Sequence, residues 1–162
     1  MKKIILSSLI ILITINVHSQ TRPSNKVKKA FNEKYVNADI IKWESEKEKN
    51  RVVIWKAMFK TNDVLSVAWF DPKGNWIQTK TKINEDELPE AVLKSIEENY
   101  YMYKIVITAR FENPEDKGYE VFLTNDMDGF DVQFSKDGEI LSRTIRSEGY
   151  KPIDNDGKEI DE

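Results

Sequence analysis

The sequence predicts an α+β fold, in which two helices pack on one face of a single antiparallel sheet of about eight strands. Three observations lead to this prediction: an internal repeat, an amphipathic helical stretch at the start of each repeat, and alternating apolar runs with tight turns after each helix. The predicted architecture is a tandem α-β-β-β-β repeat. Its expected segments are a signal peptide, a first repeat, a second repeat and an acidic flexible tail, which cover residues 1–19, 20–84, 85–146 and 147–162.

The repeat has an offset of 64 or 65 residues, and it holds in register over three separate stretches of the chain. The first stretch matches the helix positions Val27, Phe31 and Tyr35 with Val92, Ile96 and Tyr100. The others match Trp55, Ala57 and Phe59 with Tyr119, Val121 and Leu123, and the turn Phe70–Gly74 with Phe134–Gly138. Agreement at three stretches with the same element types indicates a duplicated unit.

Each repeat is predicted to begin with an amphipathic helix. In the first repeat, apolar residues recur at helical spacing from Val27 to Tyr35, and Ser24 or Asn25 is available as the N-cap. In the second, the same stripe runs from Val92 to Tyr100. Pro89 precedes it at a first-turn position, where a missing N–H costs nothing. Each helix therefore has one apolar face to bury.

Four strands are predicted after each helix, because the apolar residues then recur at every second position. In the first repeat they lie around Ile41 and Trp43, and at 52–59, Val64–Phe70 and Trp76–Ile83. In the second repeat they are Ile105–Phe111, Tyr119–Thr124, Phe130–Ser135 and Glu139–Arg146. Turns rich in Gly, Asp, Asn and Pro join them, so successive strands are expected to pair as antiparallel hairpins.

The first 19 residues are typical of a secretory signal peptide. Lys2 and Lys3 form a basic start, residues 4–15 are almost wholly apolar, and Val17-His18-Ser19 provides a cleavage site. The apolar stretch is too short to span a bilayer comfortably. We therefore expect cleavage after Ser19, no membrane anchor afterwards, and a protein that is secreted across a membrane.

Composition excludes several kinds of chemistry. The chain has no Cys, and its one His, His18, lies in the predicted leader. Residues 20–162 therefore offer no disulfide, no Cys or His zinc ligand, no thiol nucleophile and no imidazole base. They hold 23 basic and 28 acidic side chains, a net charge of −5, of which −4 falls on residues 147–162. The nearly neutral remainder has no concentrated basic surface, which argues against a nucleic-acid partner.

No stretch of the sequence points to catalysis, so we predict a protein that is not an enzyme and uses no cofactor or metal ion. Acidic pairs such as Glu97 and Glu98 lie on a predicted amphipathic helix, where charges face water. No Gly-x-Ser-x-Gly elbow, Ser-x-x-Lys motif or glycine-rich phosphate loop occurs. Asp126–Gly129 and Asp154–Gly157 resemble the start of a calcium loop but lack its first and last ligands. They are interpreted as a hairpin turn and as part of the tail.

The alternation also assigns residues to the two faces of the sheet. The set expected to face the helices is Trp43, Trp55, Ala57, Phe59, Phe70, Ile107, Tyr119, Val121, Leu123, Val132 and Phe134. The opposite face is mainly polar in the second repeat but unusually apolar in the first. There we predict a surface that binds a protein partner, because contiguous exposed apolar patches usually mark contact sites. Its residues are Ile54, Met58, Leu65, Val67 and Trp69. Two alternatives stay open: a register shifted by one residue in Val64–Phe70, or a cover formed by a loop or by the tail.

The turn and core residues carry a family resemblance. Trp43, Phe70–Trp76, Leu88-Pro89 and Phe134–Gly138 stand in the order seen in the PepSY-like family of bacterial periplasmic proteins, and the chain resembles that family from about Lys26 to Arg146. The resemblance implies a fold similar to that of the beta-lactamase inhibitory protein, and a binding or inhibitory role. The inhibitory protein carries disulfides, whereas this chain has no Cys, so inhibition of a beta-lactamase itself does not follow.

Three hypotheses of function result. The first is a non-enzymatic periplasmic binding or inhibitor-like module, which holds a protein partner on the sheet face opposite the helices. The second is a self-associating structural envelope protein, whose apolar surface is buried in a homodimer. The third is a carrier of a small apolar ligand.

Overall fold

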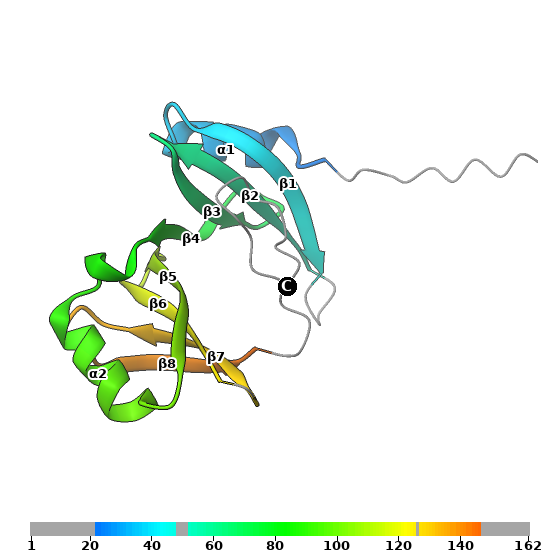
Figure 1. The fold of residues 1–162 in the computed structure, drawn as a ribbon. Helices are drawn as coiled ribbons and strands as arrows, with labels where there is room; N and C mark the ends of the chain where they lie inside the picture. The colour runs from blue at the N-terminus through cyan, green and yellow to red at the C-terminus, as the bar shows by residue number, and fades with distance from the viewer. Residues whose placement is uncertain (1–21, 48–51, 126, 147–162) are drawn as a thin grey trace, which may run out of the picture.

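The computed structural model describes residues 22–47, 52–125 and 127–146 (Figure 1). The predicted signal peptide and the predicted acidic tail lie outside these residues. Two α-helices, one short 3-10 helix and eight strands follow one another along the described chain. They are α1 (Asn25–Lys34), β1 (Asp39–Lys47), β2 (Val53–Thr61), β3 (Val64–Phe70), β4 (Trp76–Ile83), η1 (Glu85–Glu87), α2 (Glu90–Tyr100), β5 (Lys104–Glu112), β6 (Lys117–Thr124), β7 (Gly129–Phe134) and β8 (Ile140–Ile145).

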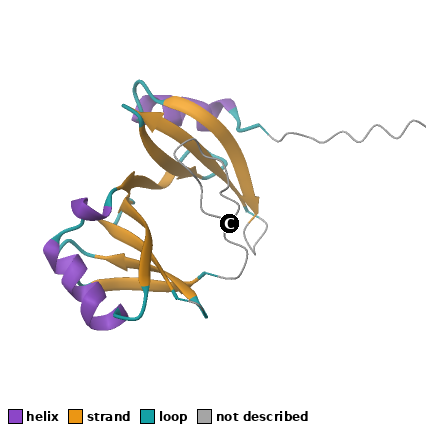
Figure 2. Ribbon diagram, viewed as in Figure 1, coloured by secondary structure: helices purple, strands orange, loops and turns teal. Residues whose placement is uncertain are grey.

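The eight strands form one sheet, in which the order in space is the order in sequence. Every neighbouring pair is antiparallel. The prediction of an α+β fold with two helices and one antiparallel sheet is therefore confirmed. Figure 2 shows that the sheet is strongly curved and that both helices lie on the outer side of the curve.

Helix α1 begins where the sequence predicts and buries the predicted stripe. The Ser24 side chain accepts a hydrogen bond from the Val27 N–H at 3.4 Å and caps the helix. Phe31, only 1% exposed, is the centre of an aromatic cluster. Its ring centroid lies 5.0 Å from that of Phe59 and 6.2 Å from that of Phe70, on β2 and β3. Edge-on ring contacts of this kind add to the area buried by the helix.

Helix α2 buries an equivalent stripe against the second half of the sheet. Val92, Ile96 and Tyr100 are buried along it. They belong to a cluster whose other buried members are Ile83, Leu88, Val121, Leu123, Phe130, Val132 and Phe134. The α1 cluster is separate, with buried members Val27, Phe31, Trp55, Ala57, Phe59, Ala68 and Phe70. The molecule thus has two apolar cores joined through one sheet.

The strand registers place both cores on the same side of the sheet. Phe59 pairs with Ser66, and Ser66 with Thr81 on β4. Thr81 then pairs with Arg110, and Arg110 with Tyr119, which packs against the α2 cluster. Cross-strand partners point to the same side of a sheet. We call this side the helix face, and the opposite side the non-helical face.

The described strands contain four β-bulges, and two of them lie at equivalent places on β1 and β5. One lies between Ile40 and Lys42 on β1, and the other between Ile105 and Ile107 on β5. The expectation that Ile107 faces the helices is wrong: Ile107 pairs with Phe122 on the non-helical face, and Ile105 packs against the α2 cluster instead. A bulge inserts one residue and so reverses which side the following residues face.

Two hairpin turns of the sheet, β3–β4 and β7–β8, contact the helices through a glycine. Gly74 and Gly138 both have positive φ, +94° and +83°. A Cβ atom on Gly74 would lie 3.0 Å from the carbonyl oxygen of Lys26, and one on Gly138 would lie 2.3 Å from that of Ala91. Each turn therefore lies directly against the first turns of the helix in its own half. Glycine is needed there both for the backbone conformation and for the close approach.

Candidate functional site

The five residues predicted to bind a partner lie together on the non-helical face. Met58 of β2 pairs with Val67 of β3, and Leu65 pairs with Lys60. Trp69 pairs with Lys56, two positions along the strand from Val67, and Ile54 pairs with Glu46 of β1. The register in Val64–Phe70 is the one that the sequence predicts, since Ala68 and Phe70 of β3 belong to the α1 core.

The burial of these residues differs from that of an open patch. Ile54 is 7% exposed, Met58 is 2% exposed and Leu65 is 6% exposed, whereas Val67 and Trp69 are half-buried. The sequence predicts one exposed surface of all five. In the structure, Val67 and Trp69 provide the accessible part, and the other three form an apolar floor. Whether this surface binds a partner stays a prediction.

Lysine side chains surround the apolar floor, and several are paired with acids of β1. Lys42 Nζ lies 2.8 Å from a carboxylate oxygen of Glu44. Lys56 Nζ lies 3.4 Å from Glu44 and 3.6 Å from Glu46. The aliphatic stems of such lysines cover apolar neighbours while their charged ends reach water. This rim gives the floor a polar border of the kind that protein interfaces show.

The titration of Glu44 is altered by this pairing. The hydrogen bond from Lys42 lowers the pKa of the Glu44 carboxyl below its ordinary value of 4.5, partial burial opposes the change, and the positive charge of Lys56 adds to it. Glu44 is therefore charged at neutral pH. In that form it pairs with Lys42 and Lys56.

A polar network continues the non-helical face across the second half of the sheet. Lys80 Nζ lies 5.5 Å from the centre of the Trp69 ring and 2.5 Å from Glu120 Oε1. Glu120, 8% exposed, also accepts a hydrogen bond from Gln133 Nε2 at 2.9 Å. Gln133 in turn accepts one from Ser142 at 3.0 Å. A continuous chain of contacts therefore leads from Trp69 on β3 to β8.

Phe111 is a member of this face that sequence reasoning missed. It is 3% exposed and pairs with Lys80 of β4, next to the apolar floor. Ala109, 8% exposed, pairs with Lys82 beside it. Simple alternation from Ile105 assigns both to the helix face. The bulge after Ile105 reverses that assignment, and no residue in the sequence marks its position.

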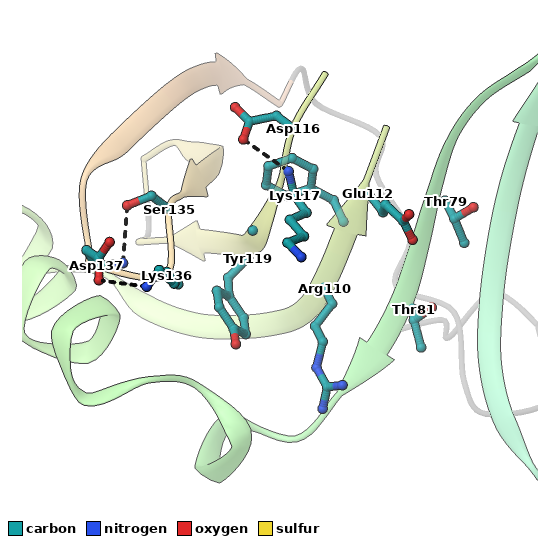
Figure 3. A pocket seen from close by; sticks show the side chains of 12 residues that line it. Thr79, Thr81, Arg110, Glu112, Asp116, Lys117, Tyr119, Ser135, Lys136 and Asp137 are labelled. Carbon is teal, nitrogen blue, oxygen red and sulfur yellow. Dashed lines mark hydrogen bonds and ion pairs between the residues drawn. The ribbon is translucent and has the colours of Figure 1, made fainter. Parts of the chain in front are cut away.

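A groove of about 630 Å³ lies on the helix face, over the central strands β4, β5 and β6. Figure 3 shows the side chains of Arg110, Lys117 and Tyr119 in it, with Thr79 and Thr81 along one side. Its charged side chains are of both signs, and Arg110 is already bonded to Glu87 at 3.0 Å. The groove exists because neither helix core extends over these strands. Its lining combines charged and polar side chains with apolar surface, to which Phe111 and Tyr119 contribute.

The described residues contain no group of three or more His, Cys, Asp or Glu side chains arranged to hold a metal ion. At the turn after β6, Asn125 Oδ1 instead accepts hydrogen bonds from the backbone N–H groups of Met127 and Asp128, each at 2.9 Å. Asp128 accepts a further bond from the Tyr103 hydroxyl at 2.8 Å. The side chains of this turn are thus used to close a hairpin.

Comparison with known families identifies the chain. The profile of the beta-lactamase-inhibitor-like, PepSY-like family matches residues 54–142, more than half of the sequence. The chain belongs to the PepSY-like family. Among curated proteins, none matches this PepSY-like protein significantly.

Solved structures share the fold of this PepSY-like protein. A BLIP-like protein from Bacteroides fragilis is 26% identical with a TM-score of 0.66, and the match covers 82% of this chain and 92% of that one. A member of a domain family of unknown function from Bacteroides uniformis is 21% identical with a TM-score of 0.65, covering 76% and 90%. A protein from Bacteroides eggerthii, provisionally assigned to the periplasm, is 20% identical with a TM-score of 0.66, covering 77% and 90%.

None of the helices that the structure describes in this PepSY-like protein has the length and apolar character needed to cross a membrane.

Proposed function

We propose that this PepSY-like protein is a non-enzymatic binding or inhibitor-like module of the bacterial periplasm, which reaches that compartment by cleavage of residues 1–19. Its partner is a protein, held on the non-helical face of the sheet. One observation carries the proposal: Ile54, Met58, Leu65, Val67 and Trp69 lie together on one face, with lysine and glutamate pairs around them. An apolar centre with a charged rim is the usual anatomy of a protein–protein contact.

Trp69 is the residue expected to contribute most to binding. It is half-buried at the centre of the face, and its ring lies near Lys80. Large rigid aromatic side chains at the centre of an interface commonly account for much of the binding energy. Lys80 is itself held by Glu120 at 2.5 Å, so the ring has a fixed neighbour on β4.

The two halves are proposed to be copies of one unit. The β1 and β5 bulges lie 65 residues apart, and those at Trp69/Phe70 and Gln133/Phe134 lie 64 apart. Gly74 and Gly138, also 64 apart, make the same approach to α1 and α2. Bulges are specific features of a fold, so their agreement in position between the two halves favours a duplicated unit. The floor of Ile54, Met58 and Leu65 lies in the first copy, and Ala109 and Phe111 of the second copy lie beside it on the same face.

The Trp69→Asp substitution tests the proposed function. The mature chain, immobilised, is expected to retain an envelope protein that mass spectrometry identifies, and Trp69→Asp is expected to weaken its binding by about 2 kcal/mol or more, roughly thirtyfold. Calorimetry with the purified partner measures the change. Tyr101→Asp is the matched control, because Tyr101 is 80% exposed and follows α2, away from the site.

Three results would count against the proposal. Equal binding by Trp69→Asp and the unchanged chain would remove the non-helical face as the site. A large loss of thermal stability in Trp69→Asp would show that Trp69 is needed for the core. Light scattering that finds a dimer at tens of micromolar, dissociated by the same substitution, would favour the self-associating envelope protein instead.

A further inference from the structure

The described chain ends on the non-helical face. Arg146 follows β8, and its backbone N–H donates to the carbonyl of Gly129 at 2.9 Å. Its side chain pairs with Asp131, with Nε 2.8 Å from Oδ2. The guanidinium carbon also lies 3.9 Å from the centre of the Phe122 ring. Asp131 and Phe122 pair with each other on the non-helical face. The residues that follow Arg146 therefore start from this side of the sheet.

The apolar floor is more deeply buried than an uncovered sheet face would be. Ile54, Met58 and Leu65 are each less than a tenth exposed. Burial of this depth is typical of residues between two layers of structure. The described helices both pack on the other face, in the clusters around Phe31 and Val92. A further segment over the floor would account for the burial.

The sixteen residues from Ser147 to Glu162 are long enough to reach it. Fully extended, a segment of that length spans roughly 53 Å. The path from β8 to β2 crosses six strand spacings, about 29 Å. The extended segment is therefore long enough to reach β2 from β8 across the non-helical face.

The charges of the segment and the face are complementary. Residues 147–162 contain six acids and two lysines, a net charge of −4. On the non-helical face, β2, β3 and β4 contribute four lysines and no acid: Lys56, Lys60, Lys80 and Lys82. Acids of the neighbouring strands already pair with two of them, Glu44 and Glu46 with Lys56 and Glu120 with Lys80, so acids of the segment would share these lysines. The segment also brings three large apolar residues for the floor, Tyr150, Ile153 and Ile160.

We propose that residues 147–162 dock on the non-helical face and cover the floor of Ile54, Met58 and Leu65 until a partner displaces them. In the proposed docked form, the acids of the segment face the lysines of β2–β4 and its apolar residues face the floor. Because the segment is part of the same chain, its effective concentration at the face is high even if each contact is weak. The docking itself needs no partner; the role as a competitor rests on the proposed function.

The test compares the mature chain 20–162 with a chain that ends at Arg146, using Trp69 as a reporter. Trp43, Trp55 and Trp76 pack with the α1 core on the helix face, so subtracting the signal of Trp69→Phe in each form isolates Trp69. Removal of the segment is expected to raise acrylamide quenching of Trp69 about twofold or more, as a half-buried ring becomes open to solvent. A synthetic peptide of residues 147–162, added to the shortened chain, is expected to reverse the rise.

A second peptide, in which the six acids are replaced by their amides, serves as the matched control. It is expected to bind about tenfold more weakly, because several ion pairs are lost together. Added salt should weaken binding of the natural peptide in the same direction. Equal quenching of Trp69 in the long and shortened chains, or no saturable binding of the natural peptide, would overturn the proposal.

Two further measurements keep the outcome decisive. If the shortened chain does not fold, the same six acid-to-amide changes are made in the full mature chain; increased quenching of Trp69 supports docking, and unchanged quenching overturns it. If light scattering shows that the shortened chain dimerises without binding the peptide, a second copy is the occupant and the proposal is wrong. None of these assays contains a partner, so their failure is distinct from failure of the proposed function.

Discussion

Glu44 shows how single side chains of the non-helical face are held by their neighbours. It contacts Lys42 at 2.8 Å and Lys56 at 3.4 Å, and it pairs across the strands with Lys56. These contacts are partly exposed to solvent, so each contributes little to the free energy of unfolding. Their main effect is to fix the positions of two positive charges beside Met58 and Trp69.

The lowered pKa of Glu44 predicts how its contribution depends on pH. In the folded chain the hydrogen bond from Lys42 holds the pKa below 4.5, so the folded state binds fewer protons than the unfolded state in acid. The stabilisation is therefore complete above about pH 4.5 and is lost as the pH falls through the folded-state pKa. We expect Glu44→Gln to cost a few tenths of a kcal/mol at pH 7, and the difference from the unchanged chain to shrink at pH 3.

Urea unfolding at the two pH values measures this difference. Glu97→Gln is a suitable control for loss of one negative charge, because Glu97 lies on the exposed side of α2. A gap between Glu44→Gln and the unchanged chain that is the same at pH 3 and pH 7 would contradict the assignment.

At the scale of elements, the glycine turns determine how each hairpin meets its helix. Gly74→Ala should cost about 1–2 kcal/mol, the usual penalty for a side chain at positive φ. Gly138→Ala should cost more, because the new Cβ would lie 2.3 Å from the Ala91 carbonyl oxygen, against 3.0 Å from that of Lys26 at Gly74. Denaturant unfolding followed by tryptophan fluorescence compares them. Equal losses would show that the turn at Gly138 moves freely away from α2.

Elements were well predicted from the sequence wherever periodicity and turn residues agreed. The helix stripes of Val27–Tyr35 and Val92–Tyr100, and the strand Val64–Phe70, correspond to α1, α2 and β3. The bulge on β5 was not predictable, because it arises from the fit of two strands and has no residue signature. It moved Ile107 and Phe111 to the non-helical face.

The sequence predicted which residues of the candidate site share one face of the sheet, but it did not predict how exposed each of them is. Alternation alone groups Ile54, Met58, Leu65, Val67 and Trp69 on one face, and the registers agree. Their burial depends on what packs against the assembled sheet, which the alternation along one strand does not show. Phe111, which comes from the other half of the chain, could be placed beside them only once the pairing of β4 with β5 was known.

At the scale of the whole molecule, two cores share one sheet. The α1 core and the α2 core have no buried residue in common, and β4 and β5 connect the halves through five paired positions. A substitution that weakens packing in one core should therefore lower the local stability of its own half of the sheet more than that of the other half. Local opening of this kind is a common property of proteins with separable cooperative units.

Native-state hydrogen exchange tests this division. Phe31→Leu, expected to cost about 1–1.5 kcal/mol, should reduce amide protection in β1–β3 more than in β6–β8. Val92→Ala in α2, where Val92 is fully buried, should give the reverse pattern. A uniform fall in protection over all eight strands in both variants would show that the sheet opens as one unit.

The sequential order of the strands has a consequence for how the protein is made. Each strand from β2 to β8 pairs with the strand that precedes it in the chain. No strand therefore needs a partner from a distant part of the sequence. A chain that folds from its N-terminus can add strands to a growing edge, one hairpin at a time, after α1 has packed. Local pairing of this kind favours fast folding and shortens the time that apolar surface is exposed to other chains.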